Sequence, residues 1–179
     1  LNSAAQWKKL YVLKGNHDGT RDSVRKGSFD ILEKLCPEVT FVTGLYEVVL
    51  PNHVGRLALF GYDPFRSSAE LAGQLTEGLN YLAAFGHYDL TSHGSDFNLV
   101  PTEVFAALKI PVVYTGHIHK QQTIERHGVT VHAVGSMQPY AHGEQAEGDP
   151  LYQTLTLDGF NARNPEDFLD VNLRILLKG

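Results

Sequence analysis

The stretch VVYTGHIHK, residues 112–120, runs a β-branched apolar segment directly into two histidines separated by one residue. Such a segment is typical of a buried strand, and Gly116 then allows the backbone to turn sharply. Imidazoles at the tip of a buried strand leave the solvated surface, so they need a compensating partner. A metal ion is one such partner, which makes His117 and His119 candidate ligands.

Two other strand ends have the same character. KLYVLKG (residues 9–15) is a short apolar strand that leads into GNHD at 15–18, and AAFGHYD (residues 83–89) carries His87 at its tip. Because the carboxyl ends of parallel strands meet along one edge of an α/β sheet, these groups are expected to converge. Imidazole nitrogens and an amide oxygen suit borderline divalent ions such as manganese, iron or zinc.

Helical and extended patterns alternate around these strand ends. Apolar recurrence predicts helices near residues 22–35, 68–82 and 102–109. Two hairpins are predicted, one over residues 46–60 about PNHVG and one over residues 123–134 about His127-Gly128. Residues 81–117 form a strand–helix–strand unit, and LYQTLTLDG and VNLRILLKG predict later strands.

The expected fold is an α/β sandwich with mixed sheets. The three strands that end in histidine motifs should share one sheet, the two hairpins should contribute to a second, and helices should cover the outer faces. Residues 1–157 are expected to form one domain, and residues 158–179 a linker with the start of a further region.

Composition narrows the class of protein. With 179 residues and 42% hydrophobic content, the chain can bury one sizeable core. A net charge of −5 argues against a globally basic nucleic-acid binder, although it leaves room for a local basic patch. The single cysteine, Cys36, cannot form an internal disulfide, and the chain shows no membrane-spanning run or signal peptide. These features predict a soluble cytoplasmic protein without a membrane partner.

The three motifs together resemble the calcineurin-like metallophosphoesterase superfamily, in order, spacing and strand context, over residues 10–120. The resemblance implies an α/β/β/α sandwich and a centre with two divalent metal ions, of which manganese is preferred and magnesium, iron or zinc remain options. It implies that one ion is held by Asn16, His87 and His117, and that His119 holds the other. A single strand-end histidine is more often an ordinary hydrogen-bonded residue, but three motifs in this order reverse those odds.

The same resemblance assigns catalytic roles within GNHD. His17 would contact the scissile phosphate and protonate the leaving oxygen, and Asp18 would orient His17 from behind. Three other histidines lie in polar, turn-like segments, where an ordinary surface role is preferred; these are His53, His93 and His127.

The chain also departs from the family pattern. The family's Asp-x-His and Gly-Asp-x-x-Asp motifs should precede GNHD, but only 14 residues stand before Gly15, and Asp-x-His occurs nowhere in the chain. Those motifs would supply the carboxylate that bridges the two ions. The chain is therefore expected to be the N-terminally incomplete part of a longer or split enzyme, with one well-formed metal site and little activity alone.

A finer resemblance comes from VGSMQPYAHGE, residues 134–144, which is similar to a phrase in SbcD-like DNA repair exonuclease subunits. It implies DNA as substrate, an SMC-like ATPase as partner, a homodimer as a further option, and a DNA-capping region that begins near the C-terminal end. His142 and Glu144 would lie at the substrate rim, and Lys14 could contact phosphate. Other cations beside the motifs could take the same role: Arg21, Arg25, Lys26, Lys120 and Arg126. The alternative for all six cations is a solvated surface position, which is usual for charged residues beside loops.

Three functions from different classes follow. The first is a manganese-dependent DNA nuclease subunit. The second is a metallophosphatase or phosphodiesterase for small phosphate esters, which shares every metal motif but does not need the QPYAHGE segment. The third is a non-catalytic remnant that is retained for binding or assembly. Activity on DNA compared with nitrophenyl phosphate esters separates the first two, and metal content tests the third.

Overall fold

The computed structural model describes residues 9–18, 27–51, 54–92 and 94–136, together with the backbone of two strands at 152–156 and 172–176. The elements within these ranges are, in order, β1 (Tyr11–Leu13), α1 (Ser28–Leu35), β2 (Thr40–Val42), β3 (Gly44–Val49), β4 (Arg56–Gly61), α2 (Ser68–Ala72), β5 (Tyr81–Gly86), α3 (Thr102–Ala107), β6 (Val112–Thr115), β7 (Gln122–Arg126), β8 (Val129–Ala133), β9 (Tyr152–Thr156) and β10 (Asn172–Leu176). The fold is mixed α/β with short helices.

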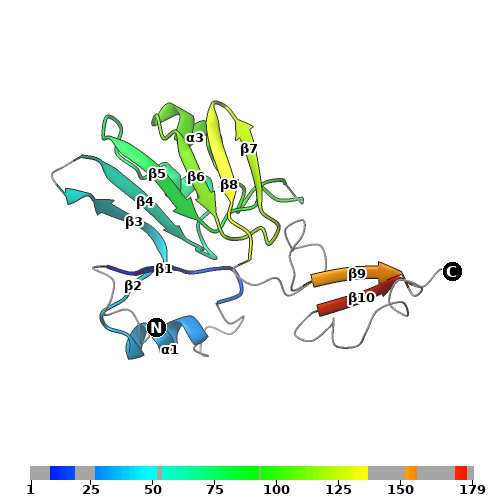
Figure 1. Ribbon diagram of the computed structural model, residues 1–179. Coiled ribbons are helices and arrows are strands. Elements are labelled where there is room, and N and C mark those ends of the chain that lie inside the picture. Colours follow the sequence, from blue (N-terminus) through cyan, green and yellow to red (C-terminus); the bar gives the residue numbers. More distant parts are fainter. Residues whose placement is uncertain are drawn as a thin grey trace.

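The largest element is a six-stranded sheet with the strand order β3-β4-β5-β6-β8-β7 (Figure 1). Its four inner strands, β4, β5, β6 and β8, run parallel, and the edge strands β3 and β7 each pair antiparallel with their neighbour. The α3 crossover connects β5 to β6, as predicted for residues 81–117. The tips of β5 and β6 therefore lie side by side at one edge of the sheet.

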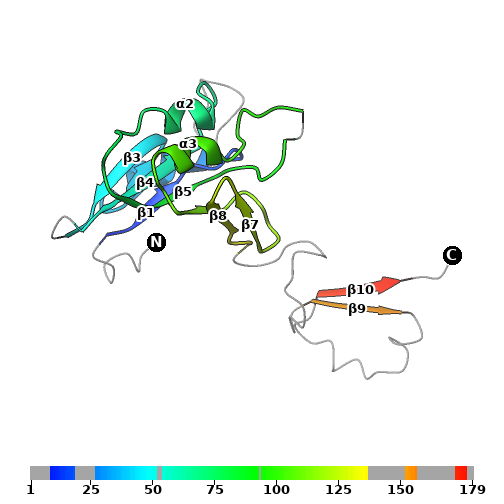
Figure 2. The same cartoon turned by 90° about the horizontal axis from the view of Figure 1, so that it is seen from above.

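A small parallel sheet of β1 and β2 lies between the large sheet and α1 (Figure 1). Phe29 of α1 packs edge-on against Phe41 of β2, with ring centroids 5.2 Å apart. Tyr11 of β1 contacts Tyr46 of β3 at 5.9 Å, which joins the small sheet to the large one. The opposite face of the large sheet carries α2 and α3 (Figure 2).

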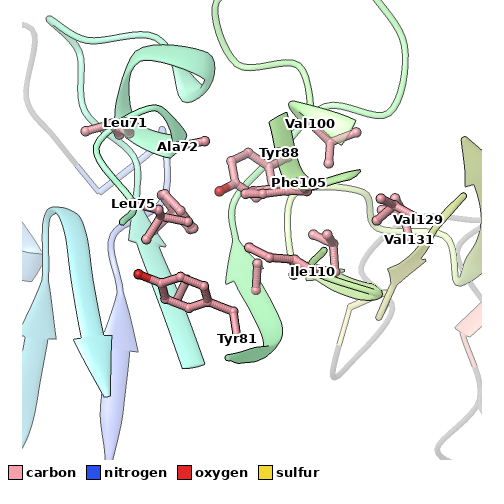
Figure 3. Packing of buried hydrophobic residues seen from close by; sticks show 14 of the residues in the cluster. Leu71, Ala72, Leu75, Tyr81, Tyr88, Val100, Phe105, Ile110, Val129 and Val131 are labelled. Atoms are coloured by element: carbon pink, nitrogen blue, oxygen red, sulfur yellow. The ribbon is translucent and has the colours of Figure 1, made fainter. Parts of the chain in front are cut away.

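The main core fills the space between the large sheet and the α2–α3 layer (Figure 3). Phe105 of α3 is fully buried and its ring lies 5.7 Å from that of Phe60 in β4. Tyr88, two residues after the end of β5, packs against both rings. Burial of such aromatic side chains contributes about 2–3 kcal/mol each, so this cluster fixes the position of the β5 tip.

The expected division into two sheets is wrong in one respect. β5 and β6 share their sheet with both hairpins, whereas β1 belongs to the small sheet. The reason is that the inner strands of both hairpins pair in parallel with the central strands: β4 with β5, and β8 with β6. Residues 58–61 of β4 are buried, as a strand in the middle of a sheet requires.

The helix predicted over residues 68–82 is much shorter. Ser67 caps α2 and accepts a hydrogen bond from Glu70 N, but the helix ends at Ala72. Gly73 follows directly, and Gly78 has a φ of +80°, which a right-handed helix cannot contain. Tyr81 and Leu82 belong to β5 instead. The helices α1 and α3 lie within their predicted ranges, and residues 22–26 lie outside the described residues.

Both predicted hairpins are confirmed. β3 pairs antiparallel with β4, and β7 pairs antiparallel with β8 through a turn at His127 and Gly128. These two residues have φ values of +54° and +75°, as a two-residue type I′ turn demands. The two late strands also form, and β9 pairs in parallel with β10. The domain boundary predicted at residue 157 lies outside the described residues.

In the described ranges, no helix combines the length and the apolar content that crossing a bilayer requires.

Candidate functional site

Three strand ends converge at one place. Asn16 follows β1, His87 follows β5, and His117 stands two residues beyond β6. The Nε2 atom of His87 lies 2.9 Å from Asn16 Oδ1 and 2.9 Å from His117 Nδ1. The two imidazole rings meet edge to face, with centroids 4.6 Å apart. We call Asn16, His87 and His117 the strand-end cluster. The structure thus brings together three of the four predicted metal ligands.

Gly15 allows the GNHD turn to approach His87 closely. A Cβ atom at this position would lie 3.1 Å from His87 Cε1 and 3.2 Å from Asp18 Oδ2, so a larger residue would crowd both side chains. The preceding residue is tied to both sheets, because Lys14 N donates to Val42 O and Lys14 O accepts from Tyr62 N. Asn16 is therefore held in place from two sides.

Thr115 fixes the tips of β5 and β6 relative to each other. Its buried hydroxyl accepts a hydrogen bond from Tyr88 N at 2.7 Å and donates one to Tyr88 O at 2.8 Å. Gly116 N donates to Gly86 O at 3.1 Å and continues the strand pairing for one more residue. These bonds set the separation between His87 and His117.

Two residues that sequence reasoning missed complete the site. Asp89 Oδ1 lies 2.8 Å from His117 Nε2, and Asn98 Nδ2 donates to His87 O at 2.8 Å. Asp89 had a readable signal, because it is an acidic residue two positions after His87 in GHYD. Asn98 had no such signal in the sequence, because only the folded loop brings this residue back to the tip of β5.

The cluster is chemically suited to a cation. A neutral His117 that donates from Nε2 to Asp89 leaves the lone pair of its Nδ1 atom facing His87 Nε2. The amide oxygen of Asn16 faces the same atom. His87 Nε2 therefore meets two acceptors, and this arrangement requires either a proton on that nitrogen or a positive ion between the three atoms.

The separations between these donor atoms fit a divalent cation bound between them. Ligands at right angles around a cation with bonds of about 2.1 Å stand about 3.0 Å apart, close to the observed separations. In the described part of the chain, no group of three or more His, Cys, Asp and Glu side chains is placed to hold a metal ion. A metal ion held here would have to take the amide oxygen of Asn16 as its third donor beside His87 and His117, and an amide oxygen is a weaker ligand than a carboxylate.

The two GNHD residues with predicted catalytic roles lie beside the cluster. Burial does most to lower the pKa of His87, and His17, which is exposed, lies close enough to contribute to the lowering. Asp18 was predicted to orient His17; the structure shows its Oδ2 atom accepting a hydrogen bond from Gly15 N at 2.7 Å. This bond closes the turn that presents His17 to solvent.

The remaining predicted site residues are more distant or undescribed. His119 is half-buried in the loop after β6, and its carbonyl accepts from Ser136 N at 2.9 Å. The Lys14 ammonium lies over the Phe29 ring, 5.7 Å from its centroid, so it packs on α1. Lys120 is exposed and Arg126 is half-buried in β7. The other predicted contacts lie outside the described residues: Arg21, Arg25, Lys26, His142 and Glu144.

His87 should make stability depend on pH. Burial lowers the pKa of His87 to about 4 from 6.5, and the neighbouring His117 adds to the lowering. Between pH 6.5 and about pH 4, the folded state therefore binds fewer protons than the unfolded state. The contribution of neutral His87 to stability is fully present above the unfolded pKa, and it is lost as the pH falls towards the folded pKa. Because His87 is partly exposed, the loss should be about 1–2 kcal/mol rather than the full amount implied by the pKa shift.

Urea unfolding with a chelator present, at about pH 7 and about pH 4.5, measures this loss. His87→Gln should remove that component of the pH dependence, because glutamine cannot take up the proton. An equal loss of stability in both proteins would show that His87 does not contribute to it.

No protein-family model and no curated protein matches the chain. The chemistry available at the site is therefore argued from its own residues: two imidazole nitrogens and an amide oxygen meet at the end of parallel strands, with two carboxylates close behind. These donor atoms are of the kinds that can bind a divalent cation.

Proposed function

We propose that this chain is the metal-binding part of a metallophosphoesterase that hydrolyses phosphodiester bonds, with DNA as its substrate. The observation that carries the proposal is the meeting of Asn16, His87 and His117 within 2.9 Å contacts at the strand ends. These residues come from three separate motifs, GNHD, GH and GHIH, and their donor atoms suit manganese. Magnesium, iron and zinc are the alternative ions.

The arrangement of layers supports the same class. α1 covers the β1–β2 sheet, this sheet packs on the six-stranded sheet, and α2 and α3 cover the far face (Figures 1 and 2). We infer from this order an α/β/β/α sandwich of the metallophosphoesterase type. The catalytic edge of such a fold lies at the strand ends that carry the cluster.

We assign a role in this chemistry to each residue of the candidate site. Bound divalent ions would activate a water molecule and neutralise charge on the phosphate oxygens. His17 is exposed beside the cluster, where it can donate a proton to the leaving oxygen. Asp18 holds the turn that carries His17 through its bond to Gly15 N. His119 would contribute to the second ion.

The chain by itself should hold only one ion. It contains no Asp-x-His, and the carboxylate that would bridge two ions is not among its motifs. Two cations at about 3.5–4 Å repel each other unless an anion is shared between them. We propose that this anion comes from a polypeptide that carries the two acidic motifs, whether it is encoded upstream of Leu1 or separately.

The preference for DNA over small phosphate esters rests on VGSMQPYAHGE, of which residues 137–144 lie outside the described residues. By the same resemblance, we propose an SMC-like ATPase as the partner of the assembled enzyme.

Manganese-dependent cleavage of linear duplex DNA tests the proposal. The isolated chain should bind one manganese ion weakly and cleave no appreciable DNA. Adding the polypeptide with the acidic motifs should raise the occupancy towards two ions and produce cleavage, and His117→Ala should abolish both.

Three results would contradict parts of this account. Robust cleavage by the isolated chain that His117→Ala abolishes would show that other residues replace the missing carboxylate. Hydrolysis of nitrophenyl phosphate esters without DNA cleavage would identify a small-molecule phosphoesterase. A completed protein that binds no divalent metal would be a non-catalytic remnant.

A further inference from the structure

Asp89 and His117 form a close pair across two strand ends. Asp89 Oδ1 lies 2.8 Å from His117 Nε2, and the two side chains are 25% and 22% exposed. The pair lies on the outer side of His117, since the other ring nitrogen of this histidine faces His87 at 2.9 Å. The carboxylate thus contacts the strand-end cluster directly, with the imidazole ring of His117 between it and His87.

The backbone of Asp89 is held by a short parallel bridge to Leu99. Asp89 N donates to Asn98 O at 2.9 Å, and Val100 N donates to Asp89 O at 3.0 Å. The side chain is held as well, because Asn98 Nδ2 lies 3.4 Å from Asp89 Oδ2 while it donates to His87 O at 2.8 Å. Asn98 therefore connects the carboxylate to the other histidine-bearing strand end.

This geometry selects one tautomer of His117. If a neutral His117 carried its proton on Nδ1, the lone pair of Nε2 would face the Asp89 carboxylate, and both groups would be acceptors. With the proton on Nε2, the ring donates to Asp89, and the Nδ1 lone pair points into the cluster. Only the second tautomer satisfies both contacts of the ring.

We propose that Asp89, supported by Asn98, is a positioning residue that fixes the ring and the tautomer of His117 and so raises the affinity of the cluster for a divalent cation. The affinity part of this inference rests on the proposed function. A carboxylate on the outer nitrogen of a metal-binding histidine orients the ring and makes its other nitrogen a stronger donor. The sequence predicted three neutral ligands with no anion beside them. Asp89 places a negative charge near these three side chains.

Two substitutions separate the roles of Asp89. Asp89→Ala removes both the acceptor and the charge, and it should weaken manganese binding by about 10–100-fold. Asp89→Asn keeps an oxygen that can accept from Nε2, so it should preserve the tautomer and lose less affinity than the alanine variant. Asp96→Asn is the matched control, because Asp96 is exposed in the same loop and should leave the affinity unchanged.

The measurements are manganese titration calorimetry of the whole chain and the ¹⁵N chemical shifts of His117 in the metal-free protein. The wild type and Asp89→Asn should show the tautomer protonated at Nε2, and Asp89→Ala should show a mixture. An unchanged tautomer in Asp89→Ala, or an unchanged manganese affinity, would overturn the inference. If the wild type binds no manganese, the proposed function and the affinity part fail, while the ¹⁵N shifts still decide whether Asp89 positions His117.

Discussion

Gly61→Ala should destabilise the protein by about 3 kcal/mol or more. A Cβ atom on Gly61 would lie 2.0 Å from Val42 O and 2.7 Å from Val42 C, and both atoms are backbone. No side-chain rotation can relieve such an overlap, so the β1–β2 sheet would have to move away from β4. The next residue, Tyr62, donates its N–H to Lys14 O, and this bond would be strained by the same movement.

The matched control is Gly73→Ala. Gly73 has an ordinary right-handed conformation at the end of α2, with φ −65° and ψ −10°. Its added Cβ would approach no atom closer than 3.4 Å, so the variant should remain as stable as the wild type or become slightly more stable. Urea unfolding followed by circular dichroism measures both variants. An unchanged midpoint for Gly61→Ala would show that the two sheets are not in direct contact there.

In the proposed two-ion enzyme, His117→Ala and His17→Ala should fail in different ways. His117 contacts His87 and Asp89 from within the strand-end cluster, so its loss should remove manganese binding and DNA cleavage together. His17 is exposed and acts on the leaving group in the proposed chemistry. His17→Ala should therefore lower turnover by about 10²–10⁴-fold while the bound manganese is retained.

The measurements for this pair are single-turnover cleavage of linear duplex DNA and metal content by mass spectrometry. His132→Ala serves as a control, since His132 lies on β8 and bonds to Thr123 of β7, away from the cluster. This variant should cleave DNA like the wild type. If His17→Ala lost its metal, His17 would be a ligand rather than a proton donor. If His117→Ala kept both ions, the cluster would not be the metal site.

Local patterns in the sequence predicted the elements that depend on local interactions. The turn at His127-Gly128 could be predicted because only a few residue types accept two consecutive left-handed positions. The meeting of His87 and His117 could be predicted because β5 and β6 are parallel neighbours, and the carboxyl ends of parallel strands lie at one edge of a sheet. Asn16 joins them from β1, which belongs to the small sheet rather than to the same sheet as predicted.

The predictions that failed depend on contacts between segments that are far apart in the sequence. The pairing of β4 with β5 joins segments on either side of α2, and apolar alternation does not show which strand will be the neighbour. The apolar spacing in residues 68–82 resembled a helix, but the cross-sheet bond from Tyr81 OH to Glu47 Oε2 belongs to a strand. Asn98 was missed because its role depends on a loop that folds back onto β5.

The sequence separations within the strand-end cluster have a consequence for the order of folding. Asn16 and His87 are 71 residues apart, and His87 and His117 are 30 residues apart. Closing loops of this length costs conformational entropy before the contacts at their ends repay it. The hairpins β3–β4 and β7–β8 need no such closure and can form early. The side chains that define the site can therefore meet only when both sheets are already assembled, so the site is among the last parts of the molecule to form.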